Sequence, residues 1–102
     1  MEITLIGDYE LTYTPDDEPA LVIHHVVRGY DAAVLDMAAV ATLRDLLAIQ
    51  QKRIRALGPY RAIFGAGGDM TLYTSTNQRA VYLDAAQTAR LAALLGVTTA
   101  RG

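Results

Sequence analysis

The side chains best suited to metal binding or general-base chemistry in this chain belong to the adjacent histidines His24 and His25. They stand in an apolar stretch typical of a strand, where neighbouring side chains point to opposite faces, so the two imidazoles cannot converge on one ion. No cysteine or carboxylate stands at the spacing of a further ligand, and we expect no metal site. His24 is expected on the helix-facing side of the strand, opposite Ala33, as a hydrogen-bonded core histidine. His25 is expected at the surface or at an interface.

Two loops carry the glycines or acids that a phosphate or a hard cation would require. The run GAGGD, residues 65–69, has the glycines of a phosphate-binding loop, but a strand-like segment follows it where such a loop needs a helix. The acids of residues 16–18 stand between Pro15 and Pro19, which is typical of a solvated turn, although paired carboxylates there could bind a cation. No Ser-His-Asp or paired-acid set can be assembled at the strand ends. We therefore predict a protein without enzymatic activity and without a cofactor.

Basic and tyrosine residues of the second half could form a contact surface for nucleic acid. The run QQKRIR, residues 50–55, is expected in the last turns of a helix, where cations oppose the negative end of the helix dipole. Alternatively, these cations join nearby tyrosines as a platform on which single-stranded bases stack while arginines contact phosphates. The candidate residues are Lys52, Arg53, Arg55, Tyr60, Arg61, Tyr73, Arg79 and Tyr82.

Two similar stretches, residues 34–47 and 82–95, indicate the elements that hold these candidates. VLDMAAVATLRDLL returns 48 residues later as YLDAAQTARLAALL, and Asp36 and Asp84 each follow a strand-like leucine. An aspartate at this point can accept hydrogen bonds from the first amides of a helix, so both are predicted N-caps.

The ends of both helices are predicted from glycines. The first helix is expected to run to about Leu57, where Gly58 and Pro59 follow, and the second to end at Gly96.

Upstream of each helix the apolar period falls to two, which predicts strands. The clearest pair is MTLYT and RAVYL around residues 75–78. With Thr74 opposite Arg79, its register should pair Met70 with Leu83, Thr71 with Tyr82 and Leu72 with Val81. In the first half, a tight turn at Arg28-Gly29 should pair Val22 with Leu35 and Val26 with Asp31. EITLIGDYELTYT is one long bent strand or two short ones around Gly7-Asp8, and PYRAIF is a further strand.

The pattern predicts the α+β class, with one antiparallel sheet built from two βββα repeats and helices packed on one face. Repeat one is expected to span residues 1–57 and repeat two residues 58–102, within one domain of 102 residues.

The first repeat is predicted to be apolar on both faces. Its face away from the helix should carry Leu21, Ile23, His25, Ala32 and Val34. An exposed apolar surface of this kind is typical of an interface, so we predict a homodimer formed through Leu21, Ile23, His25 and Val34. Alternatively, a terminal segment covers this face, or a bulge shifts the register and turns His24 outward in place of Ile23.

Composition limits the remaining classes. The chain is 52% apolar and 20% charged, contains no cysteine and shows neither a membrane span nor a signal peptide, so a cytoplasmic location is expected. Residues 1–51 carry nine acids against two arginines, whereas residues 52–102 carry seven bases against two acids. This asymmetry is compatible with an electrostatically complementary contact between subunits or with a basic patch that binds a polyanion. Alternatively, the charges of the two halves pair with one another inside the chain. The excess of arginine over lysine is typical of a GC-rich genome such as that of an actinobacterium or its phage.

The sequence thus predicts a small non-enzymatic assembly or interaction protein, homodimeric, that binds another macromolecule. The alternative is a single-stranded nucleic-acid-binding protein that uses the sheet face of repeat two. For this alternative, a strand-rich unit used twice and ending in a helix is loosely similar to the layout of PUR-type and Whirly-type single-strand binders. The overall pI near 5.5 weighs against it. No membrane partner is expected.

Overall fold

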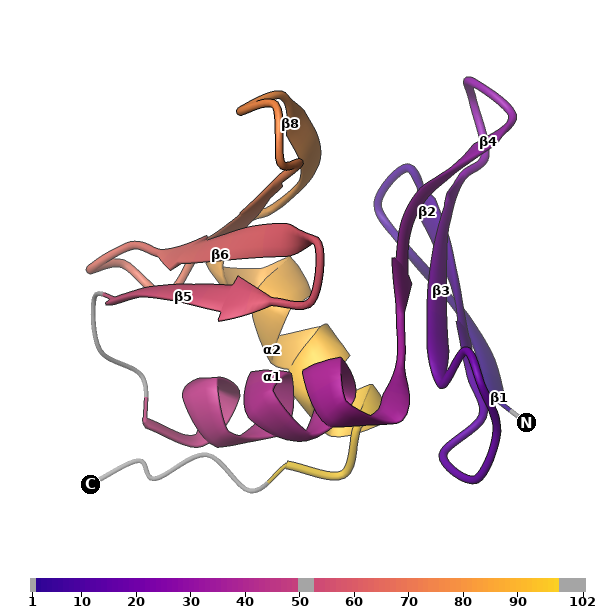
Figure 1. The fold of residues 1–102 in the computed structure, drawn as a ribbon, viewed down its shortest axis with the longest axis horizontal. Helices are drawn as coiled ribbons and strands as arrows, with labels where there is room; N and C mark the ends of the chain where they lie inside the picture. Colours follow the sequence, from indigo (N-terminus) through magenta and orange to yellow (C-terminus); the bar gives the residue numbers. More distant parts are fainter. Residues whose placement is uncertain (1, 50–52, 98–102) are drawn as a thin grey trace.

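Four short strands precede each of the two helices in the computed structural model, which describes residues 2–49 and 53–97 (Figure 1). The first antiparallel sheet has the order β1 (Glu2–Ile6), β2 (Tyr9–Tyr13), β3 (Leu21–His25), β4 (Tyr30–Leu35), and α1 (Met37–Ile49) follows it. The second has the order β5 (Arg53–Leu57), β6 (Tyr60–Phe64), β7 (Met70–Tyr73), β8 (Arg79–Leu83), followed by α2 (Ala85–Leu94). The predicted α+β class is confirmed. The predicted single sheet with three strands before each helix is wrong, because there are two sheets of four strands.

The extra strands come from two hairpins of the same construction. Ile6 pairs with Tyr9 across Gly7-Asp8, and Leu57 pairs with Tyr60 across Gly58-Pro59. Both turn glycines have positive φ, +60° and +58°, which favours glycine over residues that carry a Cβ. The expected continuation of the first helix to Leu57 is therefore wrong, because residues 57–60 belong to the second hairpin. The segment RIRAL alternates charged and apolar residues, a strand pattern that outweighs its helical spacing.

The predicted register of β3 on β4 is also wrong, by one residue. Leu21 pairs with Leu35 and Val22 with Val34, while an irregularity after Ile23 leaves Ala32 without a partner in the ladder. The connection spans residues 26–29, where the Gly29 N–H donates to the His25 carbonyl at 2.8 Å, in place of the tight two-residue turn. Since side chains alternate along a strand, this shift exchanges the faces of β3, as the bulge alternative anticipated.

The two predicted helix starts are confirmed. Asp36 Oδ1 accepts a hydrogen bond from the Ala39 N–H at 2.8 Å, and Asp84 Oδ1 accepts one from the Gln87 N–H at 2.8 Å. The Gln87 side chain in turn accepts from the Asp84 N–H, which completes a capping box at α2. At α1 the second acceptor is distant in sequence, because Glu18 Oε1 accepts from the Met37 N–H at 2.9 Å.

The predicted end of α2 is confirmed at Gly96, whose φ is +73°. The Gly96 N–H donates to the Ala93 carbonyl and the Val97 N–H to the Ala92 carbonyl, which is the Schellman pattern of hydrogen bonds.

Replacement of Asp84 by alanine should lower the free energy of unfolding by about 1 kcal/mol, because the first amides of α2 lose their acceptor. Urea denaturation followed by circular dichroism measures the change. The matched control is Asp45→Ala on the exposed side of α1, which should stay within about 0.5 kcal/mol of the wild type. Equal losses in both variants would contradict the capping role.

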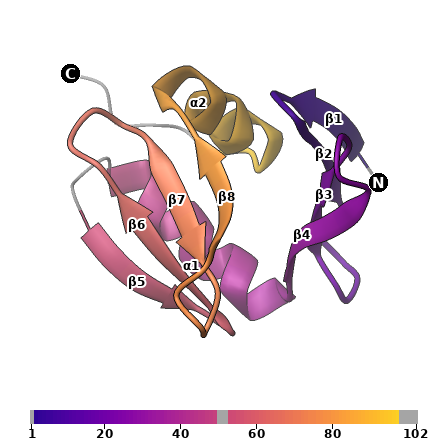
Figure 2. The same ribbon diagram turned by 90° about the horizontal axis from the view of Figure 1, so that it is seen from above.

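Each of the two helices contacts both sheets. α1 follows the first sheet in the chain and precedes the second (Figure 1). It contacts β4, the strand before it in the chain, and β5, the strand after it. α2 contacts β8 and also β1 of the first sheet, as the view in Figure 2 shows. Both helices therefore contribute to one core, whose fully buried large side chains are Ile6, Leu11, Leu21, Ile23, Leu35, Leu43, Leu57, Met70, Leu72, Leu83, Leu91 and Leu95. Neither helix in the described residues is long and apolar enough to cross a membrane.

One tyrosine of each sheet reaches an edge strand of the other sheet. The Tyr60 hydroxyl oxygen accepts a hydrogen bond from the Val34 N–H of β4 at 3.1 Å, and the Tyr9 hydroxyl oxygen accepts one from the Tyr82 N–H of β8 at 3.3 Å. At the edge strand β1, the Arg90 guanidinium of α2 donates to the Leu5 carbonyl at 2.6 Å. These contacts occupy backbone groups that would otherwise offer a strand-pairing template to another chain.

Candidate functional site on the outer faces of the sheets

Each sheet has one face in the core and one face turned away from the helices. Along β1 to β4 the outward positions form two rows across the strands, one of Ile3, Thr12, Val22 and Val34, the other of Leu5, Glu10, His24 and Asp31. We call these eight residues face A. Along β5 to β8 the corresponding rows are Ile54, Ile63, Thr71 and Tyr82, then Ala56, Arg61, Tyr73 and Arg79. We call these face B. None of these side chains is buried.

Face B combines arginines with tyrosines in close contact. The Arg61 guanidinium carbon lies 5.7 Å from the centre of the Tyr73 ring, and that of Arg79 lies 6.0 Å from the centre of the Tyr82 ring. Both distances are within the range of cation–π attraction. Arg61 is held further by a hydrogen bond of 2.6 Å to Asn77 Oδ1 in the β7–β8 loop. The arrangement presents two aromatic rings, each with a cation beside it, on an uncovered surface.

The other predicted nucleic-acid contacts do not join face B. Lys52 lies outside the described residues, and Arg53 is described only as a backbone position of β5. Arg55 alternates with Ile54 and so projects from the opposite side of β5, where it donates to the Ile54 carbonyl. Tyr60 is half-buried against the core, with its hydroxyl at the edge of β4. Of the predicted set, Arg61, Tyr73, Arg79 and Tyr82 come together.

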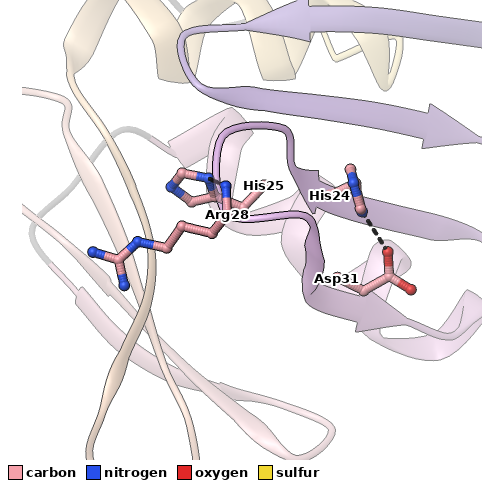
Figure 3. Close-up of polar contacts among 4 residues, drawn as sticks. All are labelled: His24, His25, Arg28 and Asp31. Carbon is pink, nitrogen blue, oxygen red and sulfur yellow. Dashed lines mark hydrogen bonds and ion pairs between the residues drawn. The ribbon is translucent and has the colours of Figure 1, made fainter.

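Face A has acidic residues where face B has arginines. His24 Nδ1 lies 2.9 Å from Asp31 Oδ1 (Figure 3). Glu10 is the neighbour of His24 across the β2–β3 ladder. The predicted core position of His24 is wrong, because the register shift turns it outward.

The two histidines project to opposite sides of β3, as predicted, and do not converge (Figure 3). His25 lies on the core side, with its ring centre 5.1 Å from that of Tyr9 and 5.9 Å from that of Tyr30. Its Nδ1 accepts a hydrogen bond from the Arg28 N–H at 3.2 Å. His25 therefore has a packing role in the first sheet and is not on the predicted outer surface.

The predicted interface residues separate into two groups. Leu21 and Ile23 are fully buried in the core, so their expected position on an outer surface is wrong. Val34 is 38% exposed on face A, as expected. Sequence reasoning missed Ile3 and Leu5, each 57% exposed on the same face, although their alternation with polar residues in β1 was a usable signal.

The remaining candidates have structural roles. Residues 65–69 connect β6 and β7, as predicted, and Glu18 of the acidic loop caps α1. No group of three potential metal ligands occurs within residues 2–49 and 53–97. A groove of about 580 Å³ lies between α1, α2 and residues 65–68, lined mainly by alanine and glycine. Its threonine, Thr88, donates its hydroxyl to the Leu83 carbonyl, which leaves the groove poor in groups for catalysis.

Comparison with protein-family models, with curated proteins and with solved structures found no match to this chain.

Proposed function

We propose that this protein binds single-stranded nucleic acid on face B. The observation that carries the proposal is the placement of two arginine–tyrosine pairs, Arg61 with Tyr73 and Arg79 with Tyr82, on one uncovered sheet face. Bases of any sequence stack on aromatic rings, and arginines beside those rings contact the phosphates of the same strand. A cation–π contact also holds each arginine near its ring before the ligand arrives.

The spacing of the rings favours an unpaired strand. Thr71 is the direct partner of Tyr82 across β7 and β8, so Tyr73 is the diagonal neighbour of Tyr82. Diagonal neighbours on a sheet lie about 7–8 Å apart, which allows two unstacked bases to lie on separate rings. In a duplex the flat faces of the bases are stacked on one another and cannot reach the tyrosines.

Binding should be seen as a fluorescence anisotropy increase with a labelled oligonucleotide at low salt. With two arginines on phosphates, affinity should fall by roughly tenfold between about 50 and 200 mM salt. Tyr73→Ala should weaken binding by about 1–3 kcal/mol because a stacking surface is lost, and Arg79→Ala should weaken it and flatten the salt dependence.

The matched control for the arginine is Arg44→Ala, on the exposed side of α1. It leaves face B unchanged and should bind as the wild type does. Absence of binding at low salt, or equal losses in Arg44→Ala and Arg79→Ala, would refute the proposal.

We also propose that the chain is a single domain that contains an internal repeat. It is supported by two hairpins with the same turn geometry, by aspartate caps at both helices and by reciprocal tyrosine contacts. Tyr9 corresponds to Tyr60 by its place after the turn. We infer that the repeat unit is ββββα, with its boundary between α1 and β5.

A second candidate function is assembly without enzymatic activity, in a cytoplasmic protein that forms a homodimer or binds another protein. It is favoured by exposed apolar side chains on face A, namely Ile3, Leu5 and Val34. Leu21 and Ile23 no longer support it, since they are buried.

A further inference from the structure

The two outer faces carry opposite charges at corresponding positions. Glu10 and Arg61 each stand on the second strand of their sheet, three residues after the turn glycine. Asp31 and Arg79 each stand at the irregular pairing of the third and fourth strands, opposite His24 and Tyr73. One row of face A therefore reads carboxylate, imidazole, carboxylate where the corresponding row of face B reads guanidinium, phenol, guanidinium.

We infer that face A of one molecule docks on face B of a second copy of this chain. In each face the two charged residues are separated by one intervening strand, which places them about 9.5–10 Å apart. Because the spacing is the same on both faces, both carboxylates can meet both guanidiniums in one docked arrangement. Arginine suits this contact, since its planar group can bind a carboxylate through two hydrogen bonds.

The apolar rows complete the match. Beside the acidic row, face A presents Ile3, Val22 and Val34; beside the basic row, face B presents Ile54, Ile63 and Tyr82. Ile3 and Ile54 are 57% and 58% exposed, so both rows leave apolar surface in water in the single chain. With the charged rows opposed, contact between the faces would bury Val22 and Val34 of one copy against Ile63 and Tyr82 of the other, with Ile3 and Ile54 at the rim.

Charge selects this pairing over the alternatives. Two copies of face A would bring carboxylates together, and two copies of face B would bring arginines together; both arrangements cost free energy. Pairing through the edges of β8, β4 and β1 is disfavoured because Tyr9, Tyr60 and Arg90 each occupy a backbone group there.

The contact should be weak and sensitive to salt. Each face consists of eight residues, against about 20–30 on each side of a standard stable interface, so we expect a Kd on the order of 10–100 µM. Docking unlike faces is a heterologous contact, which closes into a dimer or ring, or continues as a chain, according to the angle between copies.

Sedimentation velocity over a range of concentrations tests the inference. The mass of the wild type should rise from 11.0 kDa toward twice that value or more, and the rise should diminish with salt. The double variants Glu10→Arg/Asp31→Arg and Arg61→Glu/Arg79→Glu should each remain single molecules, with a Kd raised by about 100-fold. An equimolar mixture of the two should associate again, because both kinds of contact regain opposite charges.

Net charge alone is tested by a second pair of variants. Asp17→Arg/Asp45→Arg and Arg28→Glu/Arg44→Glu change the net charge equally at exposed positions outside both faces. Each should associate with itself as the wild type does, and their mixture should show no additional heterologous complex. Circular dichroism and urea midpoints establish that all four variants are folded.

Three results would overturn the inference. The first is that the wild type remains a single molecule at the highest concentration. The second is that neither face variant changes the association. The third is that the control mixture associates as strongly as the mixture of face variants.

The inference does not rest on nucleic-acid binding, and the two can fail separately. Glu10→Arg/Asp31→Arg should lose self-association while it retains oligonucleotide binding, because face B is unchanged. Arg61→Glu/Arg79→Glu should lose both. If both hold, oligonucleotide and a second copy compete for face B, so added oligonucleotide should reduce the sedimenting mass of the protein component.

Discussion

Replacement of Ile23 by glutamate should unfold the protein. Ile23 is fully buried in the core, paired with Ala33 on β4 and with Leu11 on β2. The variant loses the apolar burial of isoleucine and must place a carboxyl group where it has no polar partner, a combined cost of about 5 kcal/mol or more. Domains of this size have a total stability of about 5–15 kcal/mol. The measurement is circular dichroism with a urea titration at neutral pH.

The control for this prediction is Val34→Glu on face A. Val34 pairs with Val22 on the outer side of the same two strands, and its side chain reaches water. The free energy of unfolding should change by less than about 1 kcal/mol. A folded Ile23→Glu variant that is altered only in its oligomeric state would contradict the burial of Ile23 and restore the outer-surface position predicted from sequence.

Replacement of Gly7 by alanine should lower the free energy of unfolding by about 2–3 kcal/mol. Gly7 has a φ of +60°, where a Cβ costs roughly 1–2 kcal/mol. The added Cβ would also collide with the side-chain amide of Gln87, which completes the capping box of α2. Displacement of that side chain adds the loss of a cap contact, on the order of 1 kcal/mol. Urea denaturation measures the sum.

Gly29→Ala is the matched comparison, because Gly29 has a φ of +74° and no atom would lie within 4 Å of the new Cβ. Gly29→Ala should lower the free energy of unfolding only by the cost of placing a Cβ at a positive φ. In a Gln87→Ala background, Gly7→Ala should cost no more than Gly29→Ala does, since the obstructing side chain is gone. If both alanine variants lose the same free energy of unfolding in the wild-type background, the Gln87 side chain moves away without measurable cost, and the predicted collision is contradicted.

Local patterns predicted both helix starts correctly, and they predicted the last hairpin correctly as far as Leu72. The predicted pairing of Thr74 with Arg79 is wrong, because an irregularity after Leu72 pairs Tyr73 with Arg79. In β7 and β8, Met70 pairs with Leu83, Thr71 with Tyr82 and Leu72 with Val81, as predicted. The alternation of apolar and polar residues is strict there, so only one register buries the apolar side. The aspartate caps were predictable because a cap depends only on residues within one turn of the helix.

The errors arose where two patterns compete. β3 has apolar residues at both parities, Leu21, Val22 and Ile23, so hydrophobicity alone does not choose its buried face. The bulge that leaves Ala32 unpaired decided it. Similarly, RIRAL fits either the end of a helix or a strand, and its pairing with residues 60–64 gives β5. Only contacts between segments distant along the chain settle such cases.

The candidate site was predictable in part. Arg61, Tyr73, Arg79 and Tyr82 were recognised as a set from residue type and second-half location, and the sheet places them on one face. The acidic character of face A was not recognised, because it requires the true register of β3, which brings His24 beside Asp31. The charge segregation along the chain indicated that the two halves carry opposite charges, but it did not show on which faces those charges lie.

The reciprocal tyrosine contacts have a consequence for biosynthesis. During translation, β1 to β4 leave the ribosome before Tyr60 and Arg90, which later protect their edges, have been added to the chain. A sheet with uncovered edges is prone to pair with neighbouring nascent chains. The contacts of Tyr60 and Arg90 with these edges can form only after α2 has emerged, so we expect the first sheet to be most prone to such pairing during the interval between synthesis of the two halves.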